Sequence, residues 1–169
     1  MTSIPTARAY HGHAHAPSSG RVALTYEDRF LRRKTLLLED GTRILVDLPK
    51  TTSLDHGGVL VLTDGAEITV TAAPEALMQV TAADLTRIAW HIGNRHTPCQ
   101  IETDRLLLQP DHVIRDMLAL LGATVTDVIE PFTPEGGAYG HGRTHGHDHS
   151  HPHAHDHTHD HGPSHDHDH

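Results

Sequence analysis

The end of the chain carries the densest set of metal-binding side chains in the sequence. Of its 169 residues 20 are histidine, and 13 of these lie within residues 141–169, which contain no Val, Ile, Leu, Met, Phe or Trp. Over residues 145–161 an imidazole stands at every second position, with Gly, Asp, Ser, Pro, Ala and Thr between. These spacers cannot form a buried strand, so we expect a disordered His-rich tail over residues 141–169. Its neutral imidazoles suit borderline metals such as nickel, copper or zinc.

Within this tail we single out the first histidines as candidate ligands: His141, His145, His147, His149, His151 and His153. With two to four imidazoles per ion, 13 histidines hold on the order of three to six ions. The alternative interpretation is a purification tag or an inert low-complexity tail. A tag is normally an unbroken histidine run, whereas this tail is varied and is echoed by His11, His13 and His15, so we favour metal binding. Donor softness excludes calcium and magnesium but does not separate Ni(II) from Zn(II) or Cu(II).

Two histidines in the middle of the chain are also candidate metal ligands. His96 follows the expected exit of a helix, where a side chain projects from a rigid scaffold. A single imidazole is insufficient, but a two-fold axis beside it would bring a second copy from the partner of a homodimer. His112 lies beside Asp111 at the start of another expected helix, where the positive end of the helix dipole disfavours imidazolium and keeps the ring available. The alternative for His96 is a capping or surface role, and the alternative for His112 is an exposed residue of the first helical turn without a ligand role.

The remaining candidates are interpreted as structural. His91 lies beside Trp90, His56 precedes two glycines in a loop, and Cys99 begins a strand as a small buried hydrophobe. A lone cysteine excludes an intrachain disulfide and a four-cysteine zinc site. The sequence has no His-Glu-x-x-His, no Gly-rich phosphate loop and no Gly-x-Ser-x-Gly motif. It therefore predicts a protein that is not an enzyme.

The overall charge and hydropathy restrict the partners. The formal net charge is -9, and the densest basic cluster is residues 32–34, so we expect no nucleic-acid binding. No stretch approaches 18 consecutive apolar residues and the first ten residues have no apolar signal-peptide core. We therefore expect no membrane association and a cytoplasmic location.

Residues 21–73 are predicted to form a small antiparallel β domain, preceded by a flexible histidine-containing arm over residues 1–20. The short runs rich in Val, Ile, Leu and Thr are 21–25, 34–38, 42–48, 59–62 and 67–71. The Asp-Gly pairs at 40–41 and 64–65 are typical of hairpin turns.

Residues 74–140 change to a mixed pattern. Strand patterns over 76–80, 100–102, 105–108 and 125–129 alternate with two helix patterns. The first helix opens at a capping box of Thr81 and Asp84 and stops near Gly93. The second opens at Asp111 and stops before Gly122. The order β-α-β-β-α-β predicts a ferredoxin-like domain and an α+β fold class overall.

Three phrases together resemble a known family. They are residues 89–96 (Ala-Trp-His-Ile-Gly-Asn-Arg-His), residues 111–117 (Asp-His-Val-Ile-Arg-Asp-Met) and residues 131–140 (Pro-Phe-Thr-Pro-Glu-Gly-Gly-Ala-Tyr-Gly), which a histidine tail follows. This sequence is similar to the UreE family, the urease accessory nickel metallochaperones, over about residues 21–140. Two positions depart from the family pattern. Pro110 stands where some relatives have an additional histidine, and Trp90 stands where tyrosine is usual.

The resemblance implies a homodimer in which the two copies of His96 share one nickel ion, while the tail and peripheral histidines gather further ions. It implies a peptide-binding type of N-terminal domain and nickel transfer to apo-urease with the accessory GTPase. His112 corresponds to the histidine of the family's Asp-His-Val phrase. Two alternatives remain open: a metal storage or detoxification protein without a delivery partner, and a peptide-binding co-chaperone in which the β domain matters more than the metal.

Overall fold

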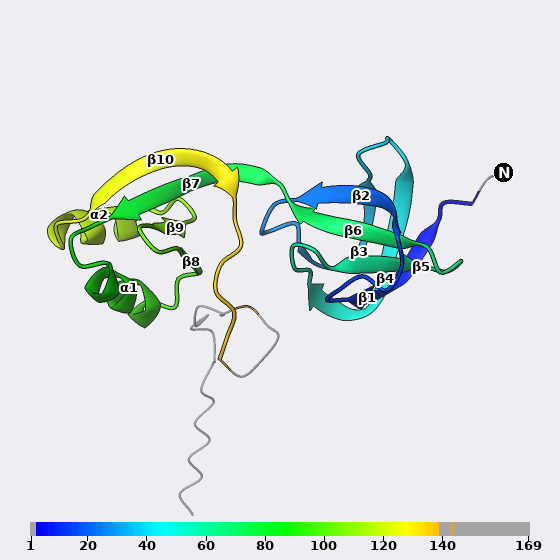
Figure 1. Ribbon diagram of the computed structural model, residues 1–169, viewed down its shortest axis with the longest axis horizontal. Helices are drawn as coiled ribbons and strands as arrows, with labels where there is room; N and C mark the ends of the chain where they lie inside the picture. The colour runs from blue at the N-terminus through cyan, green and yellow to red at the C-terminus, as the bar shows by residue number, and fades with distance from the viewer. Residues whose placement is uncertain (1–2, 139–142, 144–169) are drawn as a thin grey trace, which may run out of the picture.

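The computed structural model describes residues 3–138 and 143, and it confirms an α+β fold in which a strand-rich unit precedes a second sheet with two helices (Figure 1). The strands of the first unit are β1 (Thr6–His11), β2 (Ser18–Leu24), β3 (Phe30–Leu37), β4 (Arg43–Ser53), β5 (Val59–Leu62) and β6 (Glu67–Ala72). The elements of the second are β7 (Pro74–Thr81), α1 (Leu85–Asn94), β8 (Cys99–Ile101), β9 (Leu106–Leu108), α2 (His112–Leu120) and β10 (Thr124–Pro131).

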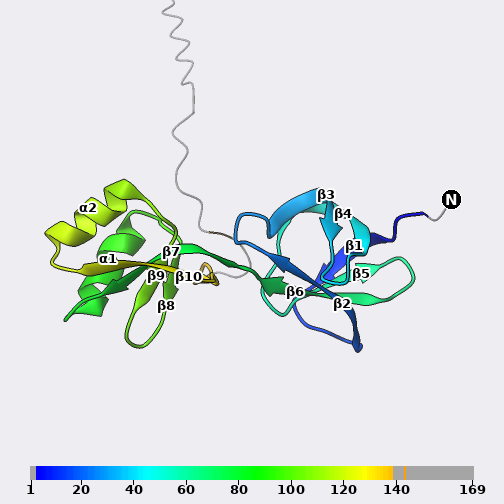
Figure 2. The same cartoon turned by 90° about the horizontal axis from the view of Figure 1, so that it is seen from above.

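The first unit is a six-stranded sheet that curls around its own core, in the order β2-β6-β5-β1-β4-β3 (Figure 2). Along β4 the side chains of Ile44, Val46 and Leu48 are buried alternately with more exposed neighbours, as expected for a strand with one buried face. Two Asp-Gly pairs form tight turns in which Gly41 and Gly65 have positive φ values of 86° and 88°. The strands and turns that these local sequence patterns predicted are therefore present in the structure.

Two expectations for this unit are wrong. Residues 1–20 are not a flexible arm, because β1 lies inside the sheet between β4 and β5 and buries Ala7 completely. The sheet is also not purely antiparallel, since β1 pairs with β4 and β2 pairs with β6 in parallel. The segment Thr6–His11 lacks a strong apolar pattern, and it forms a strand because it pairs with strands that are distant in the sequence.

The second unit is a four-stranded antiparallel sheet in the order β10-β7-β9-β8, and both helices pack against it through one buried cluster. This order is that of a split βαβ fold, as the sequence predicted. Helix α1 packs through Ile88 and Ile92, and helix α2 packs through Ile114 and Leu118. These four side chains share one buried cluster with residues of β7 and β9.

The two units are joined by buried contacts as well as by the short connection between β6 and β7. The Arg29 side chain is 3% exposed and donates hydrogen bonds to the carbonyl oxygens of Leu24, Leu54 and Phe132, at 2.9, 3.2 and 2.5 Å. Phe132 is fully buried and its ring meets the ring of Tyr26 edge-on at 5.3 Å between centroids. Because Phe132 follows β10 and Arg29 lies in the first unit, these contacts hold the end of the second sheet against the first unit.

Candidate metal centre

Helix α1 positions His96 on the surface. The helix begins after Asp84, whose Oδ1 accepts a hydrogen bond from the backbone N–H of Arg87 at 3.0 Å. Its buried side chains anchor it to the sheet, while its outer face leaves the side chain of Trp90 65% exposed. His96 follows the helix by two residues and is exposed. The His96 imidazole therefore follows a helix that is anchored to the sheet, while the ring itself stays exposed on the surface.

The backbone of His96 has an unusual conformation. Its φ is +57°, and among the described residues it is the one position other than glycine with a positive φ. Its N–H donates to the carbonyl oxygen of Gly93 at 3.0 Å, which completes the C-terminal cap of the helix. Glycine normally occupies this capping position because a side chain there is strained. The helix ends at Asn94, next to the predicted stop at Gly93, and the left-handed residue that follows its C-cap Arg95 is His96.

His112 is the first residue of α2 and is exposed. The helix begins at Asp111, whose Oδ1 accepts from the backbone N–H of Ile114 at 2.9 Å, as predicted for its N-cap. This arrangement places the imidazole at the N-terminal end of the helix, where the helix dipole is positive.

The strand register places His96 and His112 at the same end of the second unit. Cys99, the first residue of β8, pairs with Leu108, the last residue of β9. His96 precedes Cys99 by three residues and His112 follows Leu108 by four. The chain after β10 also returns to this end, because the N–H of Glu135 donates to the carbonyl oxygen of Cys99 at 2.9 Å. Thus the segment after β10 contacts the first residue of the strand that begins three residues after His96.

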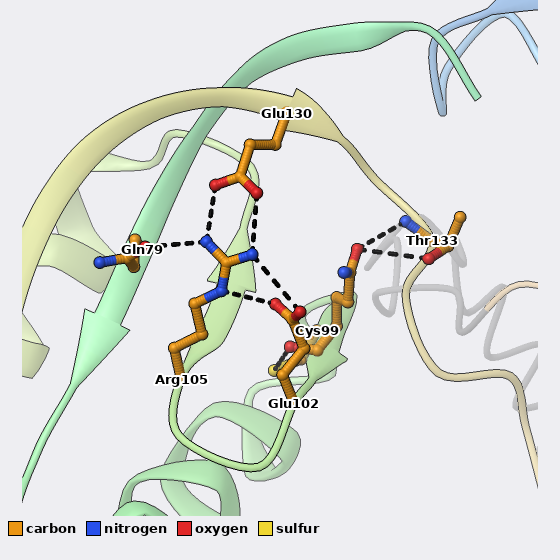
Figure 3. A network of polar contacts seen from close by, with 7 residues as sticks. Gln79, Cys99, Glu102, Arg105, Glu130 and Thr133 are labelled. Atoms are coloured by element: carbon orange, nitrogen blue, oxygen red, sulfur yellow. Dashed lines mark hydrogen bonds and ion pairs between the residues drawn. The ribbon is translucent and has the colours of Figure 1, made fainter.

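A polar network stabilises the turn of the β8–β9 hairpin (Figure 3). Arg105 donates to both carboxylate oxygens of Glu130, at 2.6 and 2.8 Å, and to the side-chain oxygen of Gln79 at 2.9 Å. Its Nε lies 2.7 Å from Glu102 Oε2. Hydrogen bonding to Arg105 lowers the pKa of Glu130 although burial opposes this shift. The guanidinium therefore connects the hairpin to both β7 and β10.

The Gln100 side chain ties the returning segment to β8 (Figure 3). Its Oε1 accepts hydrogen bonds from the N–H and hydroxyl of Thr133, at 2.8 and 3.4 Å. This contact and the one from Glu135 hold the segment after β10 along the strand that follows His96.

The three residues that were predicted to be structural, His91, His56 and Cys99, make packing or hydrogen-bond contacts with their surroundings. His91 is half-buried in α1 with its ring edge-on to Trp90, and His56 Nδ1 accepts from the N–H of Ala72 at 3.0 Å. Cys99 is half-buried rather than fully buried, and packs against the core of the second unit. Burial, with a contribution from Glu135, raises the pKa of its thiol to about 11, so it is a poor metal ligand at neutral pH.

A cavity of about 870 Å³ at the junction of the two units contains neither His96 nor His112. It is lined by residues of the first unit and of the segment after β10, including Tyr10, Tyr26, Arg29, Phe30, Thr133 and Arg143. The Arg143 guanidinium lies over the Tyr26 ring, 3.8 Å from its centroid, and donates to the Tyr26 carbonyl oxygen. The Arg143 side chain therefore lines this cavity. The cavity is separate from the exposed imidazoles of His96 and His112.

The sequence prediction for the tail falls outside the described residues. His141, His145, His147, His149, His151 and His153 all belong to that part of the chain. Over residues 3–138 and 143, no group of three or more His, Cys, Asp or Glu side chains is arranged to hold a metal ion. Nor does this part of the chain contain a helix long and apolar enough to cross a membrane. A metal site at His96 therefore needs ligands from elsewhere.

The trio His11, His13 and His15 lies outside the candidate ligands predicted from the sequence. The structure brings their rings into contact between β1 and β2, beside the carboxylate of Glu67. The alternating spacing of the three histidines indicated that their side chains could share one orientation. No local pattern indicated the carboxylate of Glu67, which is 52 positions from His15 in the chain.

The fold and the exposed imidazoles define a two-domain, histidine-rich α+β protein whose second domain is of the split βαβ type. The family model of the UreE urease accessory protein N-terminal domain matches residues 2–73, and that of its C-terminal domain matches residues 75–169. The chain belongs to the UreE family of urease accessory proteins.

Similar proteins carry the same family name. The chain is 67% identical over 140 residues to the urease accessory protein UreE of Ruegeria sp. (strain TM1040), an alignment that covers 82% of this chain and 80% of the relative. It is 59% identical over 143 residues to UreE of Ruegeria pomeroyi, covering 84% and 96% of the two chains. It is 55% identical over 146 residues to UreE of Cereibacter sphaeroides, covering 85% and 80%.

Proposed function

We propose that this protein is a nickel metallochaperone, not an enzyme, which donates Ni(II) to apo-urease together with the urease accessory GTPase. The observation that carries this proposal is the exposed imidazole of His96, presented by a left-handed helix cap on a rigid end of the second unit. Strained backbone conformations persist where the surrounding structure enforces them, and they are concentrated at functional sites.

The proposed site is shared between two subunits of a homodimer. One exposed imidazole per chain is a weak ligand, whereas a two-fold axis beside His96 supplies two. Two nitrogen donors leave further positions on the ion for water or for other imidazoles. Such an open site exchanges ligands readily, and this is what transfer to a second protein requires.

The histidine tail is proposed to supply the exchangeable ligands. The N–H of Glu135 is hydrogen-bonded to Cys99, which follows His96 by three residues, and His141 follows Glu135 by six residues. Six extended residues span at most about 20 Å, so the tail begins within reach of the His96 end. We propose that His141, His145, His147, His149, His151 and His153 capture nickel and pass it to the His96 pair, and that His112 is a peripheral ligand. Zn(II) and Cu(II) are competing ions because the same donors bind them.

Activation of apo-urease tests the delivery role. Nickel-loaded full-length protein is incubated with apo-urease, the accessory GTPase and GTP, and urea hydrolysis is then measured. We expect activation by the parent protein and a strong loss with His96→Ala. His91→Ala is the matched control, because it removes an imidazole from the same helix region and should leave activation unchanged.

Two results would contradict the proposal. Activation by His96→Ala equal to that of the parent would remove His96 from the transfer step. Nickel binding without any activation by the parent protein would favour storage or detoxification.

A further inference from the structure

The loop between β1 and β2 brings three histidine rings together on the first unit, far along the chain from His96. His11 is the last residue of β1, and His13 and His15 lie in the loop that follows. The ring centroids of His13 and His15 are 4.6 Å apart, and those of His11 and His15 are 5.0 Å apart. The His15 ring is therefore in contact with both of the others.

The buried carboxylate of Glu67 holds the backbone of this loop in place. Glu67 is the first residue of β6 and its side chain is 5% exposed. Its Oε2 accepts hydrogen bonds from the N–H groups of His15 and Ala16, at 2.9 and 3.1 Å, and its Oε1 lies 3.6 Å from His15 Nδ1. The backbone of the loop is thereby held in place while the imidazoles remain exposed.

The ring spacing agrees with coordination of one ion. A metal–nitrogen distance of 2.0–2.1 Å places the ion about 3.2 Å from the centroid of each imidazole. Angles between octahedral and tetrahedral values then separate two ring centroids by about 4.5–5.2 Å. The observed separations of 4.6 and 5.0 Å lie in this interval.

We propose that His11, His13 and His15 form a second metal site, which binds a divalent ion of the late first transition series, with Glu67 as the outer carboxylate that orients His15. Metal-binding histidines commonly direct their other ring nitrogen to a carboxylate, which sets the tautomer and the ring orientation. Here Nδ1 of His15 faces Glu67, so Nε2 is the metal-binding nitrogen.

Assembly of the site requires only side-chain rotation. Within the described residues no three ligands already converge on one point, so binding must reorient the rings. The His15 side chain is 54% exposed, and His11 and His13 are also exposed, so their rotamers change without disturbing the core. The site lies on the first unit and does not depend on His96 or on the delivery role proposed above.

Histidine footprinting on the full-length chain tests this site despite the many tail histidines. Diethyl pyrocarbonate modifies free imidazole, and trypsin then separates the relevant histidines into different peptides. Cleavage after Arg8 and Arg21 gives residues 9–21, which contain His11, His13 and His15 and no other histidine. Residues 51–87 contain only His56, which is the internal control, and residues 96–105 contain only His96.

We expect Ni(II) or Zn(II), each added to metal-free protein, to slow modification of residues 9–21 at concentrations that leave residues 51–87 unaffected. Unchanged modification of residues 9–21 with both ions would overturn the proposal. Because residues 96–105 are followed separately, failure at His96 is distinguished from failure here.

Two variants examine the geometry. His13→Ala changes an exposed side chain and should reduce the protection of His11 and His15, since the three share one ion. Glu67→Gln should raise the metal concentration needed for half-protection by about 10- to 100-fold, the usual cost of losing an outer carboxylate. Full protection of His11 and His15 in the His13→Ala variant would show that the rings do not share an ion. An unaltered metal affinity in a folded Glu67→Gln variant would remove the carboxylate from the site.

Discussion

Replacing His96 by glycine separates the metal-binding role of this residue from its contribution to folding. His96 caps helix α1 with a φ of +57°, a conformation that costs a residue with a side chain roughly 1–2 kcal/mol. Glycine avoids this strain but loses about 0.5–1 kcal/mol of additional backbone entropy on folding. The exposed imidazole buries little surface. We therefore expect His96→Gly to stabilise the metal-free protein by about 0.5–1 kcal/mol.

The companion variant His96→Ala keeps the strain and removes the imidazole. It should be less stable than His96→Gly by about 1 kcal/mol and close to the parent protein. Thermal unfolding in the presence of a chelator measures these differences. For a folded unit of this size, 1 kcal/mol corresponds to a change in Tm of about 2–5 °C.

The same two variants should lose the interface ion. In chains that lack residues 141–169 and also carry His11→Ala, His13→Ala and His15→Ala, native mass spectrometry should find one nickel ion per dimer where His96 is kept and none for either variant. A fall of Tm in both variants well beyond 5 °C would identify His96 as a structural residue. Retention of the ion by both would place the metal site elsewhere.

Three further predictions concern the tail, the second helix and the hairpin network. Removal of residues 141–169 should reduce the total bound nickel steeply while the ion shared by the His96 pair and the ions at His11, His13 and His15 remain, as read by native mass spectrometry; a shortened protein that binds none would refute the interface site. Asp111→Ala removes the N-cap of α2 and should destabilise the protein by about 1 kcal/mol in thermal unfolding, and an unchanged Tm would show that the cap contributes nothing. The pKa of Glu130 is lowered in the folded state, so its contribution to stability is present above its ordinary value of 4.5 and is lost as the pH falls through and below that value. Glu130→Gln should therefore make the unfolding free energy less dependent on pH in acid titrations, and an equally steep dependence in both proteins would contradict this origin.

Much of the fold could be predicted from local patterns. The strand at Val59–Leu62 coincides with its predicted run, and Asp111 is the N-cap that its position before an apolar helix indicated. The order of elements in the second unit was sufficient to predict the split βαβ topology. These predictions succeed because hydrophobic periodicity, caps and turn residues act over a few neighbouring positions.

The errors lie where distant segments decide the structure. Thr6–His11 has no strong strand pattern of its own, and it becomes a strand because β4 and β5 pair with its two edges. The end of α1 near Gly93 was predicted correctly, but the left-handed position after the helix is occupied by His96 instead of glycine, and no local pattern indicated this.

The sequence by itself determined the donor chemistry of this protein: the number of imidazoles, their alternation in the tail and the phrase that ends in His96. Only the tertiary structure decided how donors are presented. It placed the carboxylate of Glu67 against His15, 52 positions away, and brought Glu135 back to Cys99 beside the His96 end. Side-chain type is a property of one residue, whereas the position of a ligand depends on strand pairing and packing between segments that are remote in the chain.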